Sequence, residues 1–136
     1  MSEQAILDTG PLVAFLDRSE AHHAWAVARF RQLSEPLFTC EPVLTECLFL
    51  LRLAPDAQDK LLELVERQAL TVTFRLQDEL TSVRRLMAKY RDAPMSLADA
   101  CLVRMAETSS LPVCTLDAHF AVYRKHGRVP LTVISP

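Results

Sequence analysis

Residues 5–16 read AILDTGPLVAFL, so a short apolar run, an aspartate and a second apolar run follow one another. A short apolar run that is bounded by turn residues predicts a buried strand. The Gly-Pro pair after the aspartate predicts the start of a helix. We therefore expect a strand over 5–7 and a short helix over 12–17, with Asp8 between them. Because ligands bind at the carboxyl ends of strands in open α/β sheets, Asp8 is a candidate site residue.

The length and charge of the chain limit the class of protein. The 136 residues predict one domain over 1–136, and a chain of this length needs no disulfide or structural metal to fold. Half of the residues are apolar, which excludes a disordered chain. The net charge of −2 is unusual for a protein that only binds nucleic acid. It does not exclude an enzyme that acts on phosphates through bound cations.

The four cysteines form no CxxC pair. Cys40, Cys101 and Cys114 lie among apolar neighbours, so we expect small reduced core residues rather than ligands or disulfide partners. No basic-apolar signal segment opens the chain, and no apolar run reaches transmembrane length. These features predict a cytoplasmic protein with no membrane partner.

Apolar periodicity divides the remaining sequence into alternating helices and strands. The predicted helices span 20–33, 42–53, 56–68, 77–91, 97–108 and 117–125, and the predicted strands span 37–40, 70–74, 111–116 and 129–134. Strands that alternate with helices imply βαβ crossovers. The fold class is therefore α/β, with a mostly parallel sheet of about five strands and helices on both faces.

Glu46 is the only charged residue in VLTECLFLL, residues 43–51. Apolar residues would cover every face of the predicted helix, and charged side chains are almost never fully buried without a partner. Glu46 must therefore reach a cleft, a cation or a basic partner. An ion-paired core carboxylate, with Arg52 or Arg104 as its partner, is an equally good interpretation of the helix alone.

Asp99 and Asp117 each have a purely structural interpretation. Asp99 follows Ser96 by three residues, which is close to the pattern of a capping box. Asp117 follows a predicted strand and begins a predicted helix, where an N-cap aspartate is common. Taken singly, each pattern favours the structural role. However, Asp8 and Asp117 occupy the same kind of place, the carboxyl end of a strand at the start of a helix.

Four carboxylates at one sheet edge would repel one another strongly unless cations neutralised them. Oxygen ligands completed by water suit Mg²⁺ or Mn²⁺. Thr9 and Thr115, each close in sequence to one of these aspartates, add hydroxyl groups. We expect Gly10 and Pro11 to turn the chain sharply, so that Asp8 faces the cleft and not the core.

Four blocks of the sequence resemble, in order, the motifs of the PIN-domain nucleases, and the match covers the whole chain. The blocks are ILDTGPLVAFLD, VLTECLFLL, SLADACLVRMA and CTLDAHF. Within that family, the chain is most similar to the VapC-type toxins of type II toxin–antitoxin pairs. The resemblance implies a three-layer α/β/α fold and an Mg²⁺- or Mn²⁺-dependent endoribonuclease that hydrolyses RNA phosphodiester bonds.

The resemblance also implies roles for particular residues. The predicted catalytic and metal-binding residues are Asp8, Glu46, Asp99 and Asp117, and Thr9 and Thr115 are the predicted supporting hydroxyls. Those hydroxyls would orient a carboxylate or a metal-bound water. A metal can lower the pKa of bound water and stabilise both the attacking and the leaving oxygen, so the reaction needs no side-chain nucleophile.

RNA, a cognate antitoxin and a second copy of the chain in a homodimer are the partners that the resemblance implies. The early helices would line a groove for the antitoxin, whose arginine could block the acidic residues. Two alternatives are a PIN-fold ribonuclease in RNA processing without an antitoxin and a non-catalytic α/β interaction module. A phosphatase of the haloacid dehalogenase type would need a second aspartate where Gly10 stands. A dinucleotide-binding domain would need a GxGxxG motif, which is absent.

Other prominent residues have simpler interpretations. No histidine pair has metal-ligand spacing, and His119 is a remote candidate for a substrate contact. Two basic groups are predicted to be solvated surface, with RNA guidance as the alternative: Arg84, Arg85, Lys89 and Arg91, and Arg124, Lys125 and Arg128. The predicted core includes Trp25, Phe30, Phe49 and Leu50.

Overall fold

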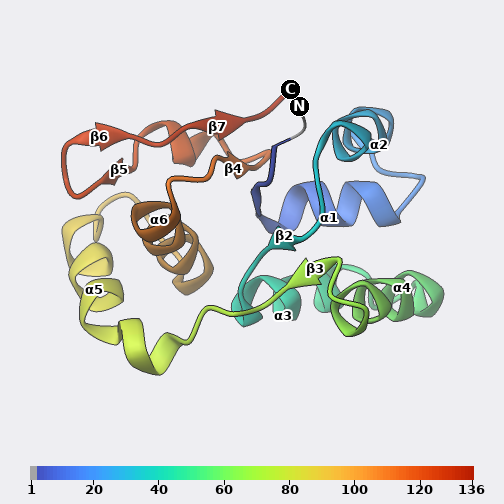
Figure 1. The fold of residues 1–136 in the computed structure, drawn as a ribbon, viewed down its shortest axis with the longest axis horizontal. Helices are drawn as coiled ribbons and strands as arrows, with labels where there is room; N and C mark the ends of the chain where they lie inside the picture. The colour runs from blue at the N-terminus through green and yellow to red at the C-terminus, as the bar shows by residue number, and fades with distance from the viewer. Residues whose placement is uncertain (1–2) are drawn as a thin grey trace.

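A five-stranded parallel sheet forms the centre of the computed structural model, which describes residues 3–136 (Figure 1). Its strands are β1 (Ile6–Leu7), β2 (Leu37–Phe38), β3 (Leu70–Thr71), β4 (Val113–Cys114) and β7 (Val133–Ile134). Their order is β3-β2-β1-β4-β7, and all neighbours are parallel. The strand order therefore reverses between β1 and β4, and such a switch point is where α/β sheets bind ligands.

Helices cover both faces of this sheet, as the alternating sequence pattern predicted. They are α1 (Thr9–Leu16), α2 (His23–Gln32), α3 (Glu41–Leu50), α4 (Pro55–Glu66), α5 (Leu76–Lys89) and α6 (Leu97–Ser109). Figure 1 shows α5 and α6 on one side of the sheet and α1, α2 and α4 on the other. The predicted three-layer α/β/α fold is confirmed. Within residues 3–136, no helix is long and apolar enough to cross a membrane.

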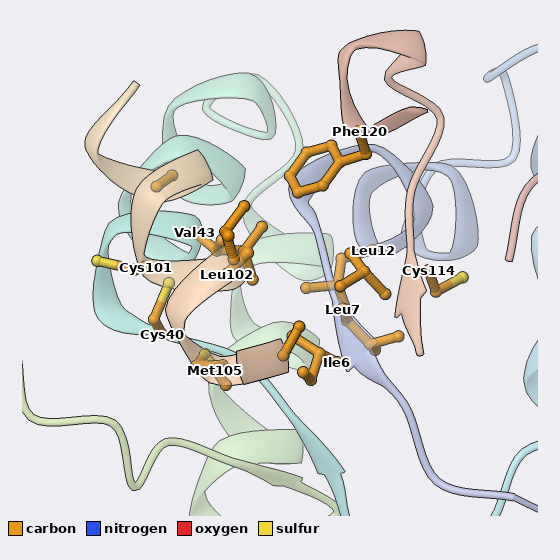
Figure 2. Close-up of a cluster of buried hydrophobic side chains, with 14 of the residues drawn as sticks. Ile6, Leu7, Leu12, Cys40, Val43, Cys101, Leu102, Met105, Cys114 and Phe120 are labelled. Atoms are coloured by element: carbon orange, nitrogen blue, oxygen red, sulfur yellow. The ribbon is translucent and has the colours of Figure 1, made fainter. Parts of the chain in front are cut away.

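Buried side chains from β1 and α6 form the centre of the core. Ile6 and Leu7 are at most 1% exposed, and Figure 2 shows them in one cluster with Leu102 and Met105 of α6. The four cysteines are buried and free, as predicted for the three among apolar neighbours. The run before Asp8 is therefore a central buried strand that delivers this carboxylate to the sheet edge.

The prediction for the first helix was wrong at its start. Helix α1 begins at Thr9 directly after Asp8, so Gly10 and Pro11 lie in its first turn and do not form a separate sharp turn. Proline is tolerated there because the first helical N–H groups have no intrahelical acceptor. A Cβ atom on Gly10 would lie 3.1 Å from the Cβ of Leu116. The glycine therefore allows the close approach of α1 to the segment after β4.

The C-terminal region also differs from the prediction. A single 3₁₀ turn, η1 (Ala118–Ala121), replaces the helix expected over 117–125, and β5 (Arg124–Lys125) and β6 (Val129–Pro130) follow as an antiparallel hairpin. His126 and Gly127 have φ values of 51° and 75°, and such positive values suit a tight hairpin turn. The strand expected over 129–134 is thus divided between β6 and β7.

Candidate active site

A cleft of about 430 Å³ lies at the carboxyl ends of β1 and β4, at the switch point of the sheet. Its lining comes from four separate segments of the chain: Asp8, Thr9, Gly10, Glu46, Ser96, Asp99, Leu116 and Asp117. All four acidic residues predicted from the sequence are in this set. Thr9 lines the cleft directly, whereas Thr115 lies just behind it.

Asp8 is the most buried of these acidic residues, with 7% of its surface exposed. It caps α1, and its Oδ1 accepts a hydrogen bond of 2.7 Å from the backbone N–H of Thr9. Its Oδ2 accepts one of 2.6 Å from the hydroxyl of Thr115. Burial raises the pKa of Asp8 from 3.8 to about 6; these two hydrogen bonds oppose the rise, and the charges of Asp99 and Asp117 add to it. The site thus holds a carboxylate whose charge is incompletely compensated.

Glu46 reaches the cleft from α3 and is exposed there. Its Oε2 accepts a hydrogen bond of 2.8 Å from the hydroxyl of Thr9. The interpretation as a core ion pair is wrong, because Arg104 binds Glu79 and Glu107 instead. Arg52, in the turn after α3, donates to the backbone carbonyl of Phe49. Of the cleft, cation or basic partner that the sequence required for Glu46, the structure shows the cleft.

Helix α3, which carries Glu46, leaves one of its apolar faces uncovered. Phe49 and Leu50 are 62% and 55% exposed, so their prediction as core residues was wrong. The sequence shows that a helix face is apolar, but it does not show whether a neighbouring element covers that face. The helix therefore has one covered face, one face on the cleft and one apolar face turned to solvent.

Asp99 fulfils the structural prediction and also lies in the cleft. The hydroxyl of Ser96 accepts from the N–H of Asp99 at 3.0 Å, and Oδ2 of Asp99 accepts from the N–H of Ser96 at 3.2 Å, which is a capping box. The same Oδ2 accepts a 3.1 Å hydrogen bond from the hydroxyl of Tyr123. Burial, and then the charge of Asp99, raises the pKa of Tyr123 above its usual value, so the phenol is a donor at neutral pH.

Asp117 likewise combines a cap with a place in the cleft. It caps η1, and its Oδ1 accepts from the backbone N–H of His119 at 2.9 Å and lies 2.8 Å from Nδ1 of the same residue. Its own N–H donates to the hydroxyl of Thr115 at 2.9 Å. Thr115 thus connects Asp8 and Asp117 directly. His119 remains a candidate for a substrate contact, now placed beside an acidic residue of the cleft.

Comparison with known proteins identifies the family. The model of the PIN domain family matches residues 5–126, a range that includes the whole cleft. The chain belongs to the PIN domain family. A curated relative, "Ribonuclease VapC26" from Mycobacterium tuberculosis (strain ATCC 25618 / H37Rv), is 29% identical over 133 residues, which is 95% of this chain and 98% of the relative. The resemblance to VapC-like PIN nucleases stated from the sequence is confirmed.

The donor set of this PIN domain fits a hard divalent cation. The cleft offers carboxylate and hydroxyl oxygens and contains no sulfur or imidazole group in its lining, a set that suits Mg²⁺ or Mn²⁺. Across residues 3–136, no three acidic, histidine or cysteine side chains lie close enough together to hold an ion as they stand. Several of the carboxylate oxygens instead accept hydrogen bonds from the protein.

Two contacts of the PIN domain cleft were not predicted from the sequence. One is the hydrogen bond from Tyr123 to Asp99, and the other is the packing of Gly10 against Leu116. Tyr123 follows Asp117 by six residues in a segment predicted as a helix, and its sequence neighbours do not indicate its partner. The contact of Gly10 could have been suspected from the sequence, because Gly10 is one of only two glycines in the chain.

Proposed function

We propose that this PIN domain is a Mg²⁺- or Mn²⁺-dependent endoribonuclease that acts in the cytoplasm. The observation that best supports this proposal is the buried carboxylate of Asp8, which lies in a cleft with three further acidic residues. Among the described residues, no lysine or arginine lines this cleft. A divalent cation would compensate the charges and turn the acidic cleft into one that accepts a phosphate. RNA as substrate is supported by the printed name of the relative, a ribonuclease.

The proposed roles follow from the hydrogen bonds of the cleft. The four acidic residues would hold the ion or ions, which when bound would supply the Lewis acidity for hydrolysis of a phosphodiester. Thr115 fixes Oδ2 of Asp8 and Thr9 fixes Oε2 of Glu46, so both carboxylates are oriented in advance. Such outer hydrogen bonds are commonly needed for full metal affinity.

An RNA cleavage assay with purified protein tests the proposal. We expect cleavage to depend on added Mg²⁺ or Mn²⁺, to stop with EDTA, and to fall more than about 100-fold in Asp8→Asn and Asp99→Asn. Asp59→Asn is the matched control, because Asp59 is exposed on α4 and does not line the cleft. If both cleft variants cleave RNA as fast as the wild type in an EDTA-sensitive assay, the assignment is wrong. A protein that binds no divalent cation and cleaves no RNA would indicate an interaction module.

We also propose that the domain is the toxin of a type II toxin–antitoxin pair. The VapC relative supports this role, as does an apolar pocket of about 420 Å³ between α1, α2 and α4, with Phe15, Phe30 and Leu64 in its lining. Co-expression with the product of a neighbouring small gene tests it. We expect the two proteins to co-purify and the partner to inhibit cleavage. An active protein that the partner neither binds nor inhibits would favour RNA processing without an antitoxin.

A homodimer is the third part of the proposal. Phe49, Leu50 and Leu53, which we call the α3 patch, are 62%, 55% and 91% exposed at the end of α3. Contiguous exposed apolar side chains of this kind often mark an interaction site. A second copy of the chain would remove them from water.

A further inference from the structure

Asp99 is held through one of its two carboxylate oxygens. Oδ2 accepts both the N–H of Ser96 at 3.2 Å and the hydroxyl of Tyr123 at 3.1 Å. Within residues 3–136, Oδ1 accepts no hydrogen bond. With both donors on one oxygen, the carboxylate is anchored on the protein side and retains a free oxygen. That is the arrangement expected of a side chain that must offer one oxygen to a ligand.

The Tyr123 side chain is itself rigidly placed. It is 0% exposed, and its ring packs edge-on against Tyr90 and Phe120, with centroid distances of 5.0 and 5.2 Å. A buried phenol needs an acceptor for its O–H group, and in this structure the acceptor is Asp99. Moving the phenol oxygen away from Asp99 would therefore disturb the aromatic contacts, and it would cost the hydroxyl its only acceptor among the described residues.

We propose that Tyr123 is a positioning residue that orients Asp99 for divalent-cation binding. The inference rests on the proposed function, since it requires Asp99 to be a metal ligand. Tyr123 lies shortly after η1, whose N-cap is Asp117. One short segment thus carries one acidic residue of the cleft and orients another, which couples their placement. Neither the sequence pattern nor the family match assigns a role to this tyrosine.

Tyr123→Phe and Tyr90→Phe form a matched pair of variants that tests this role. Each removes one hydroxyl from the same pair of edge-on rings. The Tyr90 hydroxyl accepts the backbone N–H of Arg124 at 2.9 Å and does not contact Asp99. The readouts are the dissociation constant for Mn²⁺, measured with MnCl₂ by electron paramagnetic resonance, and kcat and KM for RNA cleavage. Thermal unfolding in EDTA reports any change of stability in each variant.

We expect Tyr123→Phe to bind Mn²⁺ roughly 10-fold more weakly, as is usual when an outer-shell hydrogen bond is lost. Its kcat should fall at low Mn²⁺ concentration while KM for RNA stays unchanged, because the buried ring cannot touch RNA. Tyr90→Phe should keep the wild-type Mn²⁺ affinity even if it unfolds at a lower temperature. This contrast would separate the positioning of Asp99 from a general effect of the aromatic cluster.

The variant Asp99→Asn shows whether a negative result concerns the role of Tyr123 or the proposed metal site itself. If Asp99→Asn loses Mn²⁺ affinity but Tyr123→Phe binds as tightly as the wild type, the positioning role is wrong and the metal site stands. Equal weakening in both tyrosine variants also overturns the role, since the effect then belongs to ring packing. If Asp99→Asn itself binds Mn²⁺ like the wild type, the proposed metal role of Asp99 is wrong, and the inference fails with it.

Discussion

Replacing Asp8 by asparagine should stabilise the metal-free protein at neutral pH, although it should abolish activity. Burial raises the pKa of Asp8 from 3.8 to about 6, a difference of about 2.2. Each pH unit of such a difference corresponds to about 1.36 kcal/mol, so ionisation of Asp8 lowers the folding stability by about 3 kcal/mol. Asparagine has nearly the same shape and no charge. Its oxygen can accept from the N–H of Thr9, and its amide can donate to the hydroxyl of Thr115.

The sign of the pH dependence follows from proton binding. Between pH 3.8 and about 6, Asp8 is largely protonated in the folded protein but largely ionised in the unfolded chain. The stability that Asp8 contributes is therefore complete below pH 3.8 and is lost as the pH rises through about 6. The asparagine side chain of the variant does not titrate, so Asp8→Asn should match the wild type near pH 4 and exceed it by about 3 kcal/mol at pH 8, which is roughly 10 °C in Tm.

Thermal and urea unfolding in EDTA from pH 4 to 8 measure this difference. Asp59→Asn is the control, and it should follow the wild-type profile. Addition of MnCl₂ at 100 times its dissociation constant should stabilise the wild type by about 2.7 kcal/mol and leave Asp8→Asn unchanged. Equal stability of wild type and Asp8→Asn across the whole pH range would refute the reasoning, because the buried charge of Asp8 would then carry no cost.

Three further outcomes follow from other contacts. Thr115→Val removes the hydrogen-bond donor to Asp8, so the pKa of Asp8 should rise. Because a hydrogen bond to a charged group contributes about 1.5–3 kcal/mol, the acid limb of the kcat/KM profile against pH should move up by about 1–2 pH units. Gly10→Ala should lower the unfolding free energy by about 1 kcal/mol, because its Cβ would lie 3.1 Å from both Cβ and Cδ1 of Leu116. In a Leu116→Ala background the loss measured by urea unfolding should be smaller, because Cδ1 and Cγ are removed while Cβ stays. Leu53→Lys tests the proposed homodimer: a dimer that buries the α3 patch should dissociate in sedimentation velocity. Monomer stability should change by no more than about 0.5 kcal/mol, because Leu53 is 91% exposed.

The order of elements was predictable because local patterns encode it. A buried apolar run before Asp8, and prolines and aspartates at helix starts, predicted the alternation of strands and helices that the structure shows. Strand lengths were less predictable: the strand expected over 70–74 is only Leu70–Thr71, because its end depends on pairing with β2 and not on its own residues. The helix expected over 117–125 does not form; a 3₁₀ turn and a hairpin take its place, and His126 and Gly127 lie in the turn of that hairpin.

The members of the cleft were predictable for a different reason. Glu46 contrasts with the apolar residues around it, and Asp8 and Asp117 both follow buried strands. Their roles as ligands remain predictions, since the contacts of the structure show only where they lie. The exposure of Phe49 and Leu50 was not predictable, because an apolar side chain has the same sequence signal on a covered face and on an uncovered one.

The sequence by itself determined the α/β class, the capping box of Ser96 and Asp99, the cap at Asp117, and the position of Asp8 at the end of a strand. Each of these features depends on residues that lie close together in the sequence. Only the tertiary structure decided that β4 lies beside β1, which brings Thr115 to Asp8 across 107 residues of chain. It also decided that Tyr123 holds Asp99. Such contacts depend on the order in which distant strands pair, and no local pattern of apolar and polar residues encodes that order.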